Sequence, residues 1–387
     1  MRTQQEVMEE LLAGPLEARR GQLWMQATGA ATQMQANPGY YTRILQARLP
    51  LKTIFTKQIE RDLARTFPSD HFFERTETQE ALRNILTAYS WRNPNVGYCQ
   101  GMNCFVGRLF SFGFSEEETF WLLTQIVEQY LPLDYYSVMT GVMVDNKVFE
   151  RLLLSKLPKV LRFLRSREIE TSYFCVQWFV CLFASHFNKE VLARIWDFFF
   201  VKGASFLFEL ALSLTWLCRK QAIQVKEFHE VVKLIETHSR SIANPEAVLK
   251  LTSKNKFRVK KKLLASLQDR IRTAIKKELS TNLQNYTGDS VPDAECVNED
   301  DCKQRSLRTS SFFIFATESL QLREEYLSDD NLPRHFNVES LREQSNPLML
   351  GRRSHRCVLE RQHFNSMARL EDPAFGGAFF NQTEFDL

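Results

Sequence analysis

The sequence predicts an all-α protein, and three observations point to that class. Glycine and proline are sparse, at 14 and 12 of 387 residues, and no glycine occurs over 142–202 or 204–287. An all-β protein needs a turn about every 8–12 residues, so this scarcity argues against strands. Apolar residues recur instead at helical spacing, and prolines fall between the apolar segments, where they end helices.

The helical pattern is clearest in four segments. Ser115 and Glu118 form a capping box ahead of EEETFWLLTQIVEQYL, whose apolar residues share one helical face. Segments 193–200 and 206–217 are so densely apolar that we expect two buried helices. The uncharged stretch 171–188 nearly reaches the length of a membrane span, but its polar residues favour a buried core helix. We expect about a dozen helices in all.

Composition divides the chain into three parts. We expect a main domain over 14–225, a basic helical extension over 226–284, and a linker with a tail of little structure over 285–387. The chain becomes acidic and rich in turn residues after 283, and then carries only short apolar clusters, as is typical of disordered segments.

The extension contains a basic amphipathic helix, which we place at 254–279. Residues 254–277 include ten Lys or Arg and one acid. Such a helix can lie on an anionic membrane surface, or its apolar face can dock on the core, and we favour docking. Peripheral contact with endomembranes is the alternative. The predicted apolar face consists of Leu263, Leu264, Leu267, Ile271, Ala274 and Ile275.

Charge and cysteine usage narrow the class of protein. The net charge of +4 is too small to indicate a nucleic-acid partner. The eight cysteines form no CxxC pair and the histidines no metal-binding pattern, so we expect free thiols in a reducing compartment and no metal site. The N-terminal segment is too polar for a secretory signal, which favours a cytoplasmic protein.

Segment 57–68, KQIERDLARTFP, places a candidate functional arginine at the end of a helix. Ile59 can face the core while Arg65 projects from the last turn, with Asp62 one turn back to hold its guanidinium. An arginine fixed in this way suits bidentate contact with phosphate or carboxylate. On spacing alone, a surface salt bridge is the commoner explanation. Arg61, earlier on the same helix, is a rival candidate.

Segment 93–103, NPNVGYCQGMN, places a glutamine in a tight turn or at a helix start. Gln100 precedes Gly101, where another backbone could approach closely. A glutamine side chain both donates and accepts hydrogen bonds, which is what positioning a water molecule requires. Taken alone, the segment would more commonly hold a capping or turn glutamine.

Together the two segments resemble the TBC-domain GTPase-activating proteins, which act on Rab GTPases. The resemblance covers about residues 14–225, and its one departure is Pro15, which lies one place earlier than in the family's usual opening and touches only the domain's edge. The motif IxxDxxRTFP is matched by Ile59, Asp62, Arg65, Thr66, Phe67 and Pro68, and YxQGM by Tyr98, Gln100, Gly101 and Met102. A third block, WF followed downstream by IWDxFF and a glycine, is matched by Trp178, Phe179, Ile195, Trp196, Asp197, Phe198, Phe199 and Gly203. The opening RGxxW is matched by Arg20 and Trp24.

The resemblance implies a V-shaped, two-subdomain helical fold and an activator of an enzyme rather than a free-standing enzyme. The expected partner is a GTP-bound Rab GTPase, which brings the GTP and Mg²⁺, so the chain needs no cofactor of its own. Arg65 would be an arginine finger supplied in trans, and Gln100 would be a glutamine finger that places the attacking water. The activity would regulate vesicle trafficking. The alternative is a catalytically silent scaffold that binds a GTPase or an adaptor.

The other motif residues are expected to support the two fingers or the core. Asp62 would orient Arg65, Tyr98 would brace the glutamine turn, Gly101 would permit close approach, and Thr66 would shape the helix exit. Trp178 and Trp196 are expected in the core, and Asp197 is expected to pair with an arginine inside the domain.

Overall fold

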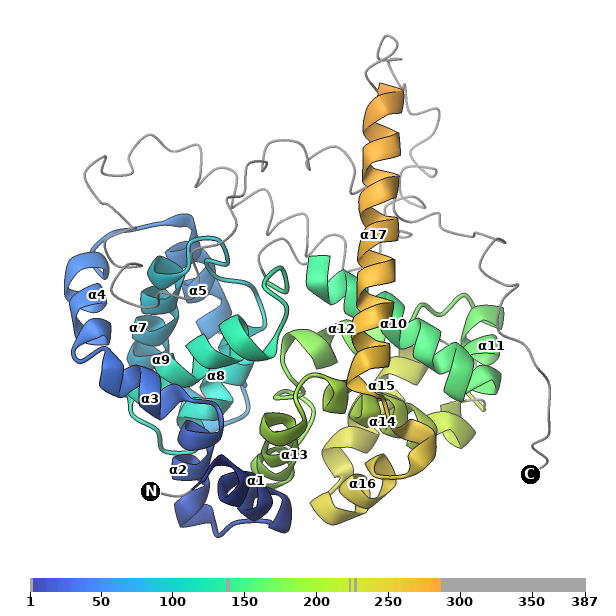
Figure 1. Ribbon diagram of the computed structural model, residues 1–387, viewed down its shortest axis with the longest axis horizontal. Helices are drawn as coiled ribbons and strands as arrows, with labels where there is room; N and C mark the ends of the chain where they lie inside the picture. The colour runs from blue at the N-terminus through green and yellow to red at the C-terminus, as the bar shows by residue number, and fades with distance from the viewer. Residues whose placement is uncertain (1–2, 137–139, 223, 226–227, 287–387) are drawn as a thin grey trace. The chain divides into compact units, whose positions relative to one another are not determined.

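The protein is built from α-helices that follow one another through short connections (Figure 1). The structure is a computed structural model, and it describes residues 3–136, 140–222, 224–225 and 228–286. No strand occurs among these residues, which confirms the predicted all-α class. The α-helices are α1 (Gln4–Ala13), α2 (Glu17–Ala27), α3 (Ala30–Ala36), α4 (Tyr40–Arg48), α5 (Ile54–Leu63), α6 (His71–Glu74), α7 (Thr76–Arg92), α8 (Met102–Ser111), α9 (Glu116–Gln125), α10 (Thr140–Lys156), α11 (Pro158–Ser166), α12 (Ser172–Val180), α13 (Lys189–Lys202), α14 (Ser205–Ala222), α15 (Phe228–Ser241), α16 (Pro245–Thr252) and α17 (Lys261–Tyr286).

Several helices begin where local chemistry directs them to. The predicted capping box is present at α9, where Ser115 accepts from the Glu118 backbone and the Glu118 carboxylate accepts from the Ser115 backbone. Pro158 occupies the first turn of α11, where its missing N–H is not needed. A π-helix, η1 (Ile126–Tyr130), continues α9, and a 3₁₀ turn, η2 (Asn255–Phe257), precedes α17. The described residues hold seventeen α-helices rather than the dozen expected, because short turns split several apolar segments.

The apolar stretch 171–188 shows how such a split occurs. It is buried as predicted, but α12 ends at Val180 and tight turns follow. Leu182 and Phe183 adopt left-handed backbone conformations, with φ of 48° and 63°. Trp196 Nε1 donates to the Leu182 carbonyl at 3.0 Å, and Phe183 N–H donates to the Trp178 carbonyl at 2.8 Å. These bonds satisfy the backbone of the turn inside the core, so the predicted single helix over 171–188 is wrong in its second half.

Residues 3–275 belong to one compact unit, within which the helices form two packed groups. In the first group, α7 contacts α4, α5, α8 and α9. In the second, α14 contacts α10, α12, α13, α15 and α16. Helix α13 packs on α1 and α2 as well as on α14 and α16, so it joins the two groups (Figure 1). Two helical groups are what the expected two-subdomain fold requires.

A buried polar cluster fastens α2 to α13. The carboxylate of Asp197 is fully buried and accepts from Trp24 Nε1 at 2.7 Å. Arg194 and Arg20 pair with the same carboxylate at 2.9 and 3.2 Å. Burial raises the pKa of Asp197, and the two arginines oppose that effect. The expected arginine pairing of Asp197 is therefore confirmed.

Helix α17 docks on the core through polar as well as apolar contacts. Gln268 Nε2 donates to Asp145 Oδ1 at 2.7 Å, and Arg272 pairs with Asp134 at 2.9 Å. The docking predicted for the basic helix is thus confirmed for the part of α17 up to residue 275. The buried and half-buried residues of this face are Leu264, Leu267, Gln268, Ile271, Arg272 and Ile275.

The docked face of α17 differs from the predicted apolar face at two positions. Leu263 is 46% exposed and Ala274 is also exposed. Gln268 and Arg272 belong to the docked face instead, where they contact Asp145 and Asp134. Membrane contact through 254–279 stays a prediction.

Residues 276–286 are helical and belong to a second compact unit. The predicted low-structure tail lies outside the described residues from 287 onward. Within the described parts, no helix is both long and apolar enough to span a bilayer.

Candidate functional site

Arg65 lies in the turn that follows α5, with its side chain 54% exposed. Its Nε and Nη2 both donate to Asp62 Oδ1, at 2.9 and 2.6 Å. Asp62, in contrast, is buried at 2% exposure, so the carboxylate is a fixed anchor below a projecting guanidinium. The predicted pairing of Arg65 with Asp62 is present. The paired edge orients the guanidinium, and the exposed remainder keeps donors for an anion from outside.

The turn after α5 carries backbone strain next to Arg65. Phe67 has a φ of 48°, which is uncommon for a bulky side chain. Its ring packs on Phe73 with a centroid distance of 4.8 Å, and the Arg108 guanidinium lies 3.9 Å from the Phe67 centroid. Thr66 donates its hydroxyl to the Asp62 carbonyl at 2.7 Å. These contacts hold the exit from α5, the role expected of Thr66, and strain of this kind gathers at functional sites.

Gln100 lies in the turn directly before α8 and is half-buried. Glycines on both sides let this turn approach its neighbours. A Cβ on Gly97, whose φ is +60°, would come within 2.1 Å of the Phe55 ring of α5. A Cβ on Gly101, whose φ is +99°, would come within 2.3 Å of Val180 at the end of α12. The close approach at Gly101 is made by the Val180 side chain of α12, whereas the sequence predicted an approach by another backbone.

Tyr98 joins the turn that carries Gln100, called the glutamine turn below, to the end of α5 next to Arg65. Its buried hydroxyl donates to Asp62 Oδ2 at 2.6 Å, while Asp62 Oδ1 holds Arg65. Burial, followed by the neighbouring Asp62 charge, raises the pKa of Tyr98 well above its usual value, so the hydroxyl stays a proton donor. The bracing role expected of Tyr98 is thus exerted through the same carboxylate that orients Arg65.

Asn103, which our reasoning from the sequence assigned no role, forms a second bridge. Its Nδ2 donates to Thr66 Oγ1 at 2.8 Å, and its Oδ1 accepts from Gly101 N–H at 3.0 Å. The amide is buried at 4% exposure and links the residue after Arg65 to the residue after Gln100. The signal that could have found it is its place in the first turn of α8, directly after Gly101-Met102, where an amide can satisfy free backbone N–H groups.

The two bridges connect the chain segments that carry the two candidate residues. Arg65 and Gln100 come from turns 35 positions apart in the sequence. Tyr98, two residues before Gln100, reaches Asp62 in the last turn of α5, and Asn103 of α8 links Thr66 to Gly101. Arg61, the rival to Arg65, is exposed on the last turn of α5 and takes part in neither bridge. Trp178 and Trp196 are 0% and 1% exposed, as expected for core residues.

Among the described residues, no group of three or more His, Cys, Asp or Glu could hold a metal ion. The five described cysteines are free thiols, as predicted, and the remaining three lie outside the described part of the chain. The site therefore offers a guanidinium and a carboxamide on rigid turns, which can bind and orient an external reactant.

Comparisons with known proteins agree with the motif pattern. A family profile described as Rab-GTPase-TBC domain matches residues 17–223. Growth hormone-regulated TBC protein 1 from Homo sapiens is 40% identical over 204 residues, which cover 52% of this chain and 60% of that protein. Small G protein signaling modulator 3 from Homo sapiens is 34% identical over 242 residues, which cover 62% of this chain and 32% of that protein. The chain thus spans less than two thirds of either relative.

Solved structures show the same fold. The Chlamydomonas flagellar RabGAP TBC domain superposes with a TM-score of 0.59 and 26% identity, over 66% of this chain and 86% of that one. The Ypt/Rab-GAP domain of Gyp1p superposes with a TM-score of 0.57 at 19% identity, which supports the fold alone. Because the family profile covers more than half of the chain, the chain belongs to the Rab-GTPase-TBC domain family.

Proposed function

We propose that this protein accelerates GTP hydrolysis by a Rab GTPase and thereby regulates vesicle trafficking. The observation that carries the proposal is the geometry of Arg65: a half-exposed guanidinium, held by the buried Asp62 carboxylate, on a turn bridged to the Gln100 turn. In this proposal Arg65 enters the partner's nucleotide site in trans, and Gln100 orients the attacking water.

The chemistry of phosphoryl transfer favours such a division of work. The reaction asks little covalent chemistry of the protein, so the rate depends on positioning the water and stabilising charge on the phosphoryl oxygens. A fixed arginine stabilises that charge, and an arginine supplied in trans contributes on the order of 10³–10⁵ in rate. The partner would bind in its GTP-bound state, because the γ-phosphate is the group that both side chains address, and it would bring the GTP and Mg²⁺.

Activity is a better proposal than a silent scaffold because both finger residues are present. A scaffold needs neither a guanidinium steadied by a buried carboxylate nor a glutamine turn fixed by two bridges. Binding of an adaptor or GTPase without catalysis would leave both features unused.

The test is single-turnover GTP hydrolysis by a panel of purified Rab GTPases, with and without the full-length chain. We expect at least one Rab to be stimulated, and we expect Arg65→Ala and Gln100→Ala each to remove most of that stimulation. Arg61→Ala is the matched control, because it removes an exposed arginine from the last turn of the same helix. Stable Rab binding without stimulation of any panel member would support the scaffold instead.

A further inference from the structure

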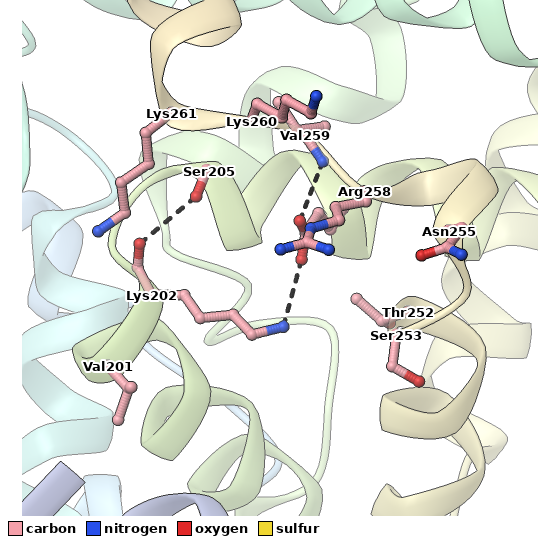
Figure 2. Close-up of a pocket in the computed structure, with 11 residues that line it drawn as sticks. Val201, Lys202, Ser205, Thr252, Ser253, Asn255, Arg258, Val259, Lys260 and Lys261 are labelled. Atoms are coloured by element: carbon pink, nitrogen blue, oxygen red, sulfur yellow. Dashed lines mark hydrogen bonds and ion pairs between the residues drawn. The ribbon is translucent and has the colours of Figure 1, made fainter.

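A pocket lies where the end of α13, the start of α14 and the connection from α16 to α17 meet (Figure 2). Its volume is about 540 Å³, within the range of roughly 300–1,000 Å³ that is usual for small-molecule sites. It shares no element with the turns that carry Arg65 and Gln100. The lining residues are Val201, Lys202, Ser205, Glu209, Thr252, Ser253, Asn255, Arg258, Val259, Lys260 and Lys261.

Nine of the eleven lining residues have polar or charged side chains. Four of the lining side chains are Lys or Arg, and one, Glu209, is acidic. Three hydroxyl groups and an amide add neutral polar contacts, while two valines are the apolar members. Small-molecule sites are mostly apolar, so this lining favours a charged, well-hydrated ligand over a lipid chain or an aromatic compound.

Glu209 is already engaged, which leaves the cations in excess. Its Oε1 accepts from the Val259 backbone N–H at 3.0 Å, and its Oε2 pairs with Lys202 at 3.5 Å. The carboxylate therefore holds the α16–α17 connection against α14. Arg258, Lys260 and Lys261 form no salt bridge with any described residue and are exposed. These three residues thus add positive charges to the lining that no described carboxylate pairs with.

Helix ends alone do not set the sign of the electrostatic potential in this pocket. The first residues of α14 and α17 line it, but so do the last residues of α13 and α16. The partial positive charges of two helix starts and the partial negative charges of two helix ends oppose one another. The side-chain cations, close together across a cavity of this size, therefore decide which ligand charge is favoured.

We propose that this pocket binds a compact anion with two or more phosphate groups, such as a polyphosphorylated inositol. Each phosphate carries about −1.5 to −2 charges, so more than one is needed to match three unpaired cations together with the Lys202–Glu209 pair. Arginine suits phosphate oxygens through its planar fork, and lysine suits them as a point charge. None of the lining residues is aromatic, so a nucleobase would find nothing to stack on. This inference is independent of the proposed GTPase-activating function.

The test is isothermal titration calorimetry of the 387-residue protein with inositol 1,4,5-trisphosphate. Arg258→Ala/Lys261→Ala removes two pocket cations, and Lys254→Ala/Lys262→Ala removes two exposed cations from the same segment that do not line the pocket. We expect saturable binding by the wild type, weakened by about tenfold or more in the pocket pair and by less than about threefold in the control pair. Thermal unfolding of each variant is measured to check that the fold is retained.

The source of the phosphates is decided with vesicles. Phosphatidylcholine vesicles that contain phosphatidylinositol 4,5-bisphosphate are compared with vesicles of equal charge that contain phosphatidylserine. Selective sedimentation with the first kind, reversed by soluble trisphosphate, supports a lipid headgroup as the source, and binding of the soluble compound alone supports a free inositol phosphate. Equal weakening by both variant pairs, or no saturable binding by the wild type, overturns the proposal.

Discussion

Tyr98 and Asp62 form a buried hydrogen bond of 2.6 Å between the turn that carries Gln100 and the last turn of α5, directly before Arg65. The carboxylate of Asp62 has two oxygens with different tasks, since Oδ2 accepts from Tyr98 and Oδ1 holds Arg65. A change at Tyr98 is therefore transmitted to the orientation of Arg65, although Tyr98 itself would touch no substrate.

We expect Tyr98→Phe to lower both stability and activity. The substitution removes a donor from a buried carboxylate, which should lower the free energy of unfolding by about 1.5–3 kcal/mol. The stimulated rate of Rab GTP hydrolysis should fall between about tenfold and hundredfold, because the arginine anchor becomes less well positioned. Urea unfolding and single-turnover hydrolysis measure the two effects.

Tyr41→Phe is the matched control for this prediction. Tyr41 is also buried and donates its hydroxyl to a carboxylate, Glu116 Oε2, at 2.5 Å, but it links α4 to α9. Its loss should destabilise the fold by a similar amount and leave hydrolysis at saturating partner close to that of the wild type. An equal loss of activity in both variants would show that Tyr98 acts through stability alone.

The parts of this site that were predictable from the sequence are the local ones. Arg65 and Asp62 are three residues apart on one chain segment, so their pairing follows from helical spacing. The contact of Thr66 with Asn103 joins residues 37 positions apart, and the approach of Val180 to Gly101 joins residues 79 apart. Neither contact leaves a periodic signal, because each depends on how whole helices pack.

The same distinction applies to the fold. The capping box of α9 and the buried helices α13 and α14 were predicted from neighbouring residues and are confirmed. The end of α12 at Val180 was missed, because apolar composition continues through the turn and the Trp196 side chain that satisfies the turn comes from α13.

Gly101→Ala should destabilise the protein in two separable ways. Gly101 has a φ of +99°, which an alanine adopts at an energetic cost of about 1–2 kcal/mol, and its new Cβ would also approach Val180 Cγ1 to 2.3 Å. We expect a lower free energy of unfolding in urea and a loss of GTPase stimulation as the glutamine turn shifts.

Gly113→Ala separates the two effects. Gly113 has a similar φ of +90°, but a Cβ there would meet nothing within 4 Å. It should show the backbone cost alone. In Gly101→Ala/Val180→Ala, which opens space for the new methyl group, part of the extra loss at residue 101 should be recovered beyond what Val180→Ala alone predicts. No coupling between the two substitutions would contradict the steric explanation.

Arg65→Lys should lose nearly as much GTPase stimulation as Arg65→Ala. The structure has two nitrogens of Arg65, Nε and Nη2, on one Asp62 oxygen, an arrangement that leaves the guanidinium plane oriented. Lysine keeps the charge but has a single nitrogen, so it cannot be held by Asp62 and present a planar fork at the same time. Single-turnover hydrolysis at saturating protein measures the loss, and wild-type stimulation by Arg65→Lys would refute the role of the fork.

Asp145→Asn should make the docking of α17 less sensitive to pH. Asp145 is 2% exposed and accepts from Gln268 at 2.7 Å; burial raises its pKa to about 7, with Gln268 and Arg272 opposing the rise and Asp134 adding to it. An unfolded aspartic acid titrates near 3.8, so between about pH 4 and pH 7 the folded state keeps a proton that the unfolded state loses. The stabilising contribution is complete below pH 4 and is lost as the pH rises through 7.

The contribution of Asp145 to the pH dependence of stability is isolated by the difference in unfolding free energy between Asp145→Asn and the wild type. His186 acts in the opposite direction, because burial, and then Arg240, lower its pKa to about 3, so its contribution is lost as the pH falls from about 6.5. Subtracting wild-type from Asp145→Asn unfolding free energies removes the His186 effect. We expect this difference to be small near pH 4 and to grow in favour of the variant by on the order of 4 kcal/mol by pH 8. A difference that stays constant from pH 4 to pH 8 in urea unfolding would show that Asp145 ionises normally and that a neutral carboxyl group is not what receives Gln268.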